Sequence, residues 1–190
     1  MFSLARKKVS EELTKEMIME EANRQFLEKG FQGVSMRSIA QKLGVSHGAL
    51  YYHFNSKTEL FQAIVERYFD KLNQKLEESK RLKGLEGTFF VLLGFIEFGL
   101  TYQTPYQFMF MRVDEKLDPL LFSAPNISLE KFHETLQYLN DSKLRAQDIQ
   151  ATFIALHGFV SHYIGRTINF KEAEEAAKAY SEFLVRALVH

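Results

Sequence analysis

The 190-residue chain contains no cysteine, no tryptophan and only three prolines. Without cysteine, disulfide bonds and thiolate metal sites are excluded, and the composition fits a reducing compartment, so we expect a cytoplasmic protein. The first ten residues, MFSLARKKVS, lack the apolar run of a signal peptide. We find no stretch that reaches the roughly 18 apolar residues of a membrane span, and we therefore expect no membrane partner.

Common enzyme and metal motifs are also missing. The sequence has no HExxH, no P-loop, no dinucleotide-binding glycine pattern and no nucleophile elbow. Of its six histidines, His157 and His162 are five residues apart, a spacing that places them on different faces of a helix. We therefore predict no metal site, no cofactor and no enzymatic activity.

The charge balance gives little indication of a partner. Lysine and arginine together number 24, as do aspartate and glutamate, so the formal net charge is zero. A global positive field for nucleic acid is absent, although the segment before Leu60 is slightly basic. The run Arg6-Lys7-Lys8 is either a solvated terminus or a basic arm that follows the minor groove.

The segment from Ser35 to Phe54, SMRSIAQKLGVSHGALYYHF, predicts two short helices joined by a tight turn. Apolar residues follow helical spacing in both halves. Gly44 can adopt the left-handed conformation that ends the first helix, and Ser46 can cap the second. The second helix leaves a hydrogen-bonding and aromatic face outside, which suits entry into the DNA major groove. That face comprises Ser46, His47, Ala49, Tyr51, Tyr52 and His53.

The extended segment GVSHGALYYHFNSKTELF resembles the signature of the TetR family of bacterial transcription regulators. The match runs from about Met17 to Tyr68. The resemblance implies an all-α homodimer that binds a palindromic DNA operator. We expect a helix-turn-helix domain over residues 1–55, a connecting helix over about 56–79, and a regulatory and dimerisation domain over 80–190. The alternative for this segment is a helical hairpin in an unrelated bundle.

The DNA-binding residues follow from this resemblance and from the exposed face. We assign base contacts to His47, Ala49 and Tyr52, and leave Arg37 free to reach either backbone or base. The phosphate contacts are assigned to Ser35, Ser46, Tyr51, His53 and Lys57. Lys57 would lie at the positive end of its helix, where a charge is slightly unfavourable, so a stabilising role explains it poorly. A phosphate at that end would be bound by the lysine and by free N–H groups.

Periodicity and capping patterns predict the remaining helices. We expect helices over 14–29, 56–79, 85–102, 128–139, 147–164 and 171–189, with a loop or broken helix over 114–126. Ser56 and Glu59 read as a capping box. Thr104 is expected to cap a short helix with Pro105 at its first position and Gln107 completing another capping box. The 85–102 helix is apolar all round and should be buried.

The C-terminal half is rich in phenylalanine and methionine between Phe89 and Phe122. Most of these side chains are expected in the core, but they can also enclose a cavity for an apolar or amphipathic effector. Candidate ligand-binding residues are Phe95, Phe98, Tyr102, Phe108, Met111, Arg112, His133 and His157.

The last two helices carry small residues along one face. The resemblance implies that they form a four-helix dimer interface, whereas the alternative is packing within one subunit. Candidate interface residues are Phe153, Val160, Ile164, Tyr180, Phe183, Leu184 and Ala187. We thus predict a ligand-responsive transcriptional repressor. The alternative is a small-molecule-binding protein whose helix-turn-helix docks another protein.

Overall fold

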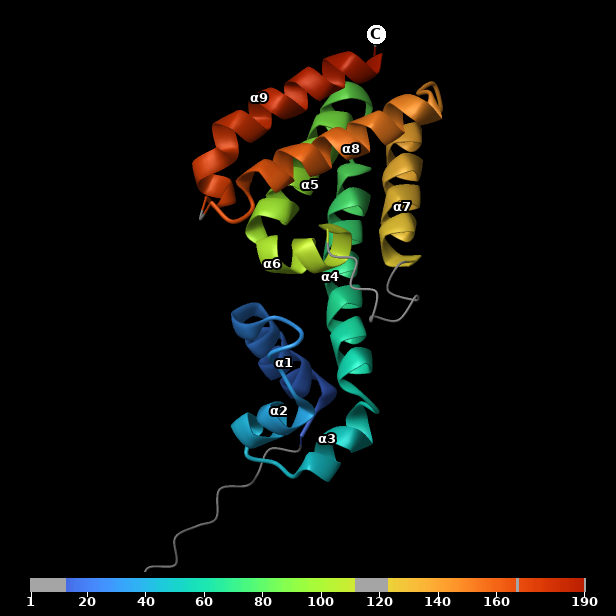
Figure 1. The fold of residues 1–190 in the computed structure, drawn as a ribbon. Helices are drawn as coiled ribbons and strands as arrows, with labels where there is room; N and C mark the ends of the chain where they lie inside the picture. Colours follow the sequence, from blue (N-terminus) through green and yellow to red (C-terminus); the bar gives the residue numbers. More distant parts are fainter. Residues whose placement is uncertain (1–12, 112–122, 167, 190) are drawn as a thin grey trace, which may run out of the picture. The chain divides into compact units, whose positions relative to one another are not determined.

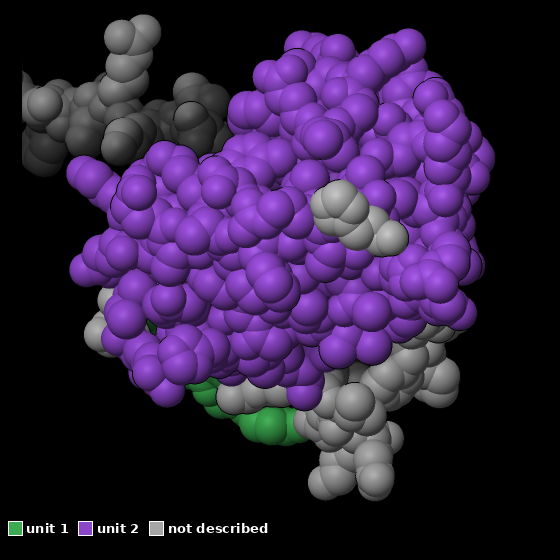
Figure 2. All heavy atoms as spheres, turned by 90° about the horizontal axis from the view of Figure 1, so that it is seen from above, with its two compact units in different colours: residues 1–64 green, residues 65–190 purple. Residues whose placement is uncertain are grey.

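A computed structural model describes residues 13–111, 123–166 and 168–189, which are helical apart from their turns and caps (Figure 1). The all-α prediction is confirmed for this part of the chain. Contacts divide the chain into two units, residues 1–64 and 65–190, which Figure 2 colours separately. This division falls inside the helix that we expected to connect the domains. The helices are α1 (Lys15–Lys29), α2 (Met36–Leu43), α3 (His47–His53), α4 (Lys57–Ser79), α5 (Gly84–Thr101), α6 (Gln103–Tyr106), the π-helical turn η1 (Gln107–Met111), α7 (Ser123–Leu139), α8 (Ala146–Tyr163) and α9 (Phe170–Val189).

In the first unit, the ends and the buried face of α1 follow from residues close together in the sequence. The Thr14 hydroxyl accepts a hydrogen bond from the Met17 N–H at 3.2 Å and caps α1, which begins one residue after the predicted start. Gly30 ends α1 with a φ of 69°. Ile18, Ala22 and Phe26 lie on its buried face, and this stripe faces the core as expected.

The second unit is organised around α5, which contacts α7, α8 and α9 (Figure 1). Its bounds agree with the prediction within one residue, but the expectation that it is buried all round is wrong. Leu85 is 54% exposed and Phe90 46% exposed in the isolated subunit. Neighbouring helices cover only part of its surface, so the apolar residues on its remaining face stay outside.

α5 also corrects the expectation about membrane spans. Its 18 residues have a mean hydropathy of 1.4, so by length and composition alone it could cross a bilayer. Half of it is buried inside the described structure, as in a core helix of a globular body. Glu86 and Glu97 interrupt the run in the sequence, but the dense phenylalanines and leucines outweigh them in the average.

The short helix after α5 differs from its predicted form. α6 begins at Gln103 with Tyr102 at the N-cap, and no side chain caps it, so the capping box on Thr104 is wrong. Gln103 Nε2 instead donates to the Ile168 carbonyl at 2.7 Å, a contact 65 residues away in the chain. Pro105 lies within the first turn, where the missing N–H has no helical partner to lose.

The later helices largely match the prediction. α8 and α9 agree within one residue at each end. α7 begins at Ser123, so the predicted loop is wrong at 123–126, and residues 114–122 lie outside the described part. Pro125 is tolerated because it falls in the first turn of α7.

A polar pair lies among aromatic rings in the second unit. The Tyr106 hydroxyl is hydrogen-bonded to His157 Nδ1. Rings of Phe95, Phe110 and Phe153 surround this imidazole, with centroids 4.5–5.3 Å from it. Burial lowers the pKa of His157 to about 4, so the imidazole is neutral in the folded protein.

This burial predicts that acid destabilises the second unit. Histidine in the unfolded chain takes up a proton near pH 6.5, whereas the buried His157 stays neutral until about pH 4. Protonation therefore favours the unfolded chain, and the unfolding free energy decreases as the pH falls from 6.5 toward 4. Between pH 7 and 5 we expect His157 to account for up to about 2 kcal/mol of lost unfolding free energy. Urea unfolding of His157→Gln should show a pH dependence smaller by about this amount, because glutamine does not titrate but can still bond Tyr106. Equal profiles for His157→Gln and the wild type would contradict the assignment.

Candidate nucleic-acid interface

The helix-turn-helix is held by caps at both of its helices. The Ser35 hydroxyl accepts from the Ser38 N–H at 3.1 Å, and Ser38 Oγ accepts from the Ser35 N–H at 3.2 Å. Gly44 is left-handed at φ 69°, ψ 27°, and the Ser46 hydroxyl accepts from the Ala49 N–H at 3.2 Å. The predicted caps are thus confirmed. Each capping serine still has its own hydroxyl hydrogen to donate outward.

A polar network that the sequence did not indicate joins α2 to α1. Gln25 is only 2% exposed. Its Nε2 donates to Glu21 at 2.7 Å and to the Ser38 carbonyl at 3.3 Å, while Ser38 Oγ lies 2.8 Å from its Oε1. The one available signal was its place three residues after Ala22 on the buried face of α1. The network fixes the start of α2 against α1.

α3 presents the face that we assign to DNA. Leu50 is buried and anchors it, whereas Tyr52 is 86% exposed and Tyr51 42% exposed. The His47 and Tyr51 rings lie 4.8 Å apart, and those of Tyr52 and His53 5.2 Å apart. Ala49 and His53 are half-exposed on the same short helix, and Arg37 is exposed on the first turn of α2.

Lys57 makes contacts that correct the sequence interpretation. Its ammonium donates to the carbonyls of Phe31 and Val34, each at 2.9 Å, and lies 4.2 Å from the centroid of the Phe31 ring. Partial burial lowers the pKa of this ammonium. The view that a structural role explains Lys57 poorly is therefore wrong. Its phosphate contact stays a prediction.

The cap of α4 is confirmed in half. The Ser56 hydroxyl accepts from the Glu59 N–H at 3.0 Å. Glu59 does not return this bond to Ser56, because its carboxylate accepts from the backbone and side-chain N–H groups of Asn55 at 2.7 and 2.9 Å. The Glu59 carboxylate thus binds the backbone N–H one residue before Ser56, the expected partner.

The described candidate ligand-binding residues lie in different surroundings within the second unit. Phe95 and Phe98 are buried and His157 lies in the aromatic cluster, while Met111 is on the surface. Phe108 is half-buried in η1, the Tyr102 ring stacks edge-on to that of Tyr68, and Arg112 lies outside the described residues.

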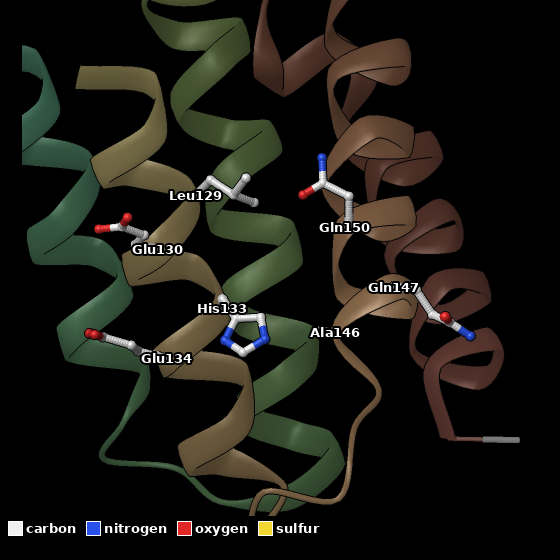
Figure 3. A pocket seen from close by; sticks show the side chains of 7 residues that line it. All are labelled: Leu129, Glu130, His133, Glu134, Ala146, Gln147 and Gln150. Atoms are coloured by element: carbon white, nitrogen blue, oxygen red, sulfur yellow. The ribbon is translucent and has the colours of Figure 1, made fainter. Parts of the chain in front are cut away.

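His133 instead lines a groove of about 550 Å³ between α7 and α8 (Figure 3). The polar side chains around it are those of Glu130, Glu134, Gln147 and Gln150, with Leu129 and Ala146 supplying apolar surface. None of these neighbours was predicted, because the walls come from two different helices whose packing the local pattern does not give. Within the described ranges no three histidine, aspartate or glutamate side chains are grouped closely enough to hold a metal ion.

The candidate dimer residues divide between core and surface. Phe153, Val160 and Leu184 are buried inside the subunit. Ile164 and Tyr180 are half-exposed, and Phe183 and Ala187 are on the surface. Two residues that were not predicted join this surface. Ile154 is exposed on α8, and the Phe159 ring stacks on that of Tyr180 at 4.9 Å.

Comparisons with known proteins assign the first unit. Residues 18–64 match the model of the family described as bacterial regulatory proteins, tetR family. Nucleoid occlusion factor SlmA from Glaesserella parasuis is 41% identical over 59 residues, which is 31% of this chain and 29% of that protein. The transcriptional regulator TtgR from Pseudomonas putida is 42% identical over 53 residues, 28% of this chain and 25% of its own length. The chain thus spans under a third of these curated relatives.

The whole fold has solved counterparts. A transcriptional regulator from Aquifex aeolicus VF5 is 29% identical, covers 91% of this chain and 98% of its own, and has a TM-score of 0.67. The local match therefore extends to the architecture of both units. Residues 18–64 therefore carry the DNA-binding domain of the TetR family of bacterial regulators, and the chain has the fold of a solved transcriptional regulator.

Proposed function

We propose that the protein is a transcriptional repressor that binds a palindromic DNA operator as a homodimer in the cytoplasm. The observation that carries this proposal is α3, a capped helix anchored by Leu50 that exposes Tyr51 and Tyr52. Large exposed aromatic side chains on so short a helix are available to a partner. In a major groove they would gain apolar and hydrogen-bonding partners.

The contacts divide into two kinds in this proposal. His47, Ala49 and Tyr52 meet base edges. Phosphates are met by the side chains of Ser35, Ser46, Tyr51 and His53, and Arg37 can serve either purpose. The hydroxyls of the capping serines already accept backbone N–H bonds, so each is oriented with its hydrogen free for a phosphate oxygen.

The surface of α8 and α9 supports dimerisation. Gly158 has open space where a Cβ would lie, and Ala151, Ala176 and Ala179 are exposed. Such small residues permit close approach of helices from a second copy, and exposed Phe183 supplies a large apolar contact. Two copies on a twofold axis would place two α3 helices against two operator half-sites.

An apolar or amphipathic effector is the proposed signal, and the α7–α8 groove is its proposed site. Its volume of about 550 Å³ lies within the range of small-molecule sites. Binding there would shift α4, whose first turn belongs to the DNA-binding unit. A coupling of about 1–3 kcal/mol would change operator affinity roughly 5–150-fold.

Native mass spectrometry tests the effector site. We expect purified wild-type protein to carry a defined extra mass that denaturing extraction releases. His133→Trp should reduce the bound fraction, because the larger indole would narrow the groove between α7 and α8. Tyr138→Trp, on the same helix but outside the groove, should leave it unchanged. A bound fraction undiminished in His133→Trp would show that the effector binds elsewhere.

The rival reading is a small-molecule-binding protein whose α3 docks another protein. A mobility-shift assay on DNA upstream of its own gene separates the two functions. Salt-sensitive retention of that DNA over a scrambled duplex supports the repressor. Absence of retention, both before and after extraction of any bound small molecule, supports the rival.

A further inference from the structure

The α1–α2 turn presents carbonyl groups that no helix satisfies. Phe31 and Val34 lie between Gly30, which ends α1, and Ser35, which caps α2. The Phe31 carbonyl has a long backbone contact of 3.5 Å from the Val34 N–H. Backbone carbonyls in such turns need partners from elsewhere in the fold. Lys57, more than twenty residues later, supplies two short bonds at 2.9 Å.

The lysine side chain lies on an aromatic platform. Its ammonium is 4.2 Å from the Phe31 ring centroid, within cation–π distance. That ring packs on those of Phe26 and Phe61, with centroids 5.8 and 4.9 Å away. Phe26 belongs to α1 and Phe61 to α4. The ammonium and the rings beneath it therefore join α1, the α1–α2 turn and the first turns of α4 into one cluster.

This geometry leaves little of the ammonium for DNA. Lysine has three N–H donors, and two are already directed at protein carbonyls. A phosphate contact has to use the third donor or break the existing bonds. The predicted phosphate contact and the observed hydrogen bonds therefore compete for the same Lys57 ammonium group.

We propose that Lys57 is a positioning residue, which acts on DNA binding by holding the α1–α2 turn, and with it Ser35, against the start of α4. Val34 directly precedes Ser35, and Ser35 caps α2 through the Ser38 N–H. A movement of the start of α4 would therefore also move α2, in addition to α3. This inference rests on the proposed DNA-binding function.

The salt dependence of binding separates positioning from phosphate contact. Removing one phosphate contact reduces the slope of log affinity against log salt by about 0.9 per subunit, whereas loss of positioning lowers affinity without changing the slope. We would measure Lys57→Met, which keeps a long apolar stem, and Lys57→Gln, which keeps two N–H donors without the charge. Lys29→Met controls for the loss of one exposed charge in the same unit. The DNA is the duplex that the wild-type full chain selects from a random-sequence pool.

Amide exchange of the full chain without DNA provides an independent readout. In Lys57→Met we expect exchange at Val34, Ser38 and Ile39 to accelerate about tenfold, with an intermediate effect in Lys57→Gln and none in Lys29→Met. Operator affinity should fall in the same order, at an unchanged slope. A slope flattened by about 0.9 per subunit, or wild-type exchange in Lys57→Met, would overturn the proposal. Should the wild type select no DNA, the proposed function fails while the exchange data still decide whether Lys57 holds the turn.

Discussion

Phe183→Glu should convert the proposed dimer into monomers and weaken operator binding by at least about 100-fold. Phe183 is 56% exposed on α9 and stacks at 6.3 Å with Tyr180, which in turn stacks on Phe159 of α8. In a twofold interface a carboxylate at this position would be buried near its own copy, with like charges opposed. The monomer would then lose the benefit of engaging both half-sites together, which is typically 10²–10⁴-fold.

Light scattering after gel filtration, followed by mobility shift on the selected operator, measures both effects. Tyr138→Glu is the matched control, because Tyr138 is an aromatic residue on α7 that is similarly exposed. It should remain dimeric and bind normally. A dimeric Phe183→Glu chain would refute the α8–α9 interface, and a monomer with undiminished operator affinity would refute the need for two half-sites.

Tyr52→Ala should reduce the operator's advantage over random duplex DNA. The side chain is 86% exposed, so its loss should change the unfolding free energy by no more than about 0.5 kcal/mol. A direct base contact is worth about 1–3 kcal/mol of discrimination, which corresponds to roughly 5–150-fold at each half-site. We therefore expect Tyr52→Ala to lower the affinity for the operator and to leave the affinity for random duplex DNA unchanged.

Titration of the operator and of a scrambled duplex at one salt concentration gives the ratio that decides this prediction. Tyr138→Ala, another exposed tyrosine outside the DNA-binding unit, should leave both affinities unchanged. An equal loss on both duplexes would assign Tyr52 to the DNA backbone instead of the bases. Unchanged ratios would remove it from the interface.

The elements that the sequence predicted well depend on neighbours in the chain. Ser35 and Ser46 each cap a helix through an N–H three residues later, so a short window of sequence contains the whole interaction. Gly44 needs only its own backbone freedom to end α2. The helix bounds and the candidate DNA face followed from such local patterns.

The features that sequence reasoning missed depend on distant partners. Lys57 bonds carbonyls 23 and 26 residues away, and Gln25 bonds Ser38 across 13 residues. The capping pattern at Thr104 was overridden in a region where Gln103 bonds the distant Ile168 carbonyl. Phe95 has the same apolar pattern whether it fills a core or lines a cavity, and only its packing decides between them.

Selection of duplex DNA from a random-sequence pool by the full chain tests the central claim most directly. The claim predicts enrichment of an inverted repeat, bound by two chains, whose half-sites are spaced to meet two α3 helices on one face of the duplex. The same selection with Tyr52→Ala should enrich that repeat more weakly. A wild-type pool that stays random after repeated rounds, with retention no stronger than that of Tyr52→Ala, would contradict the account.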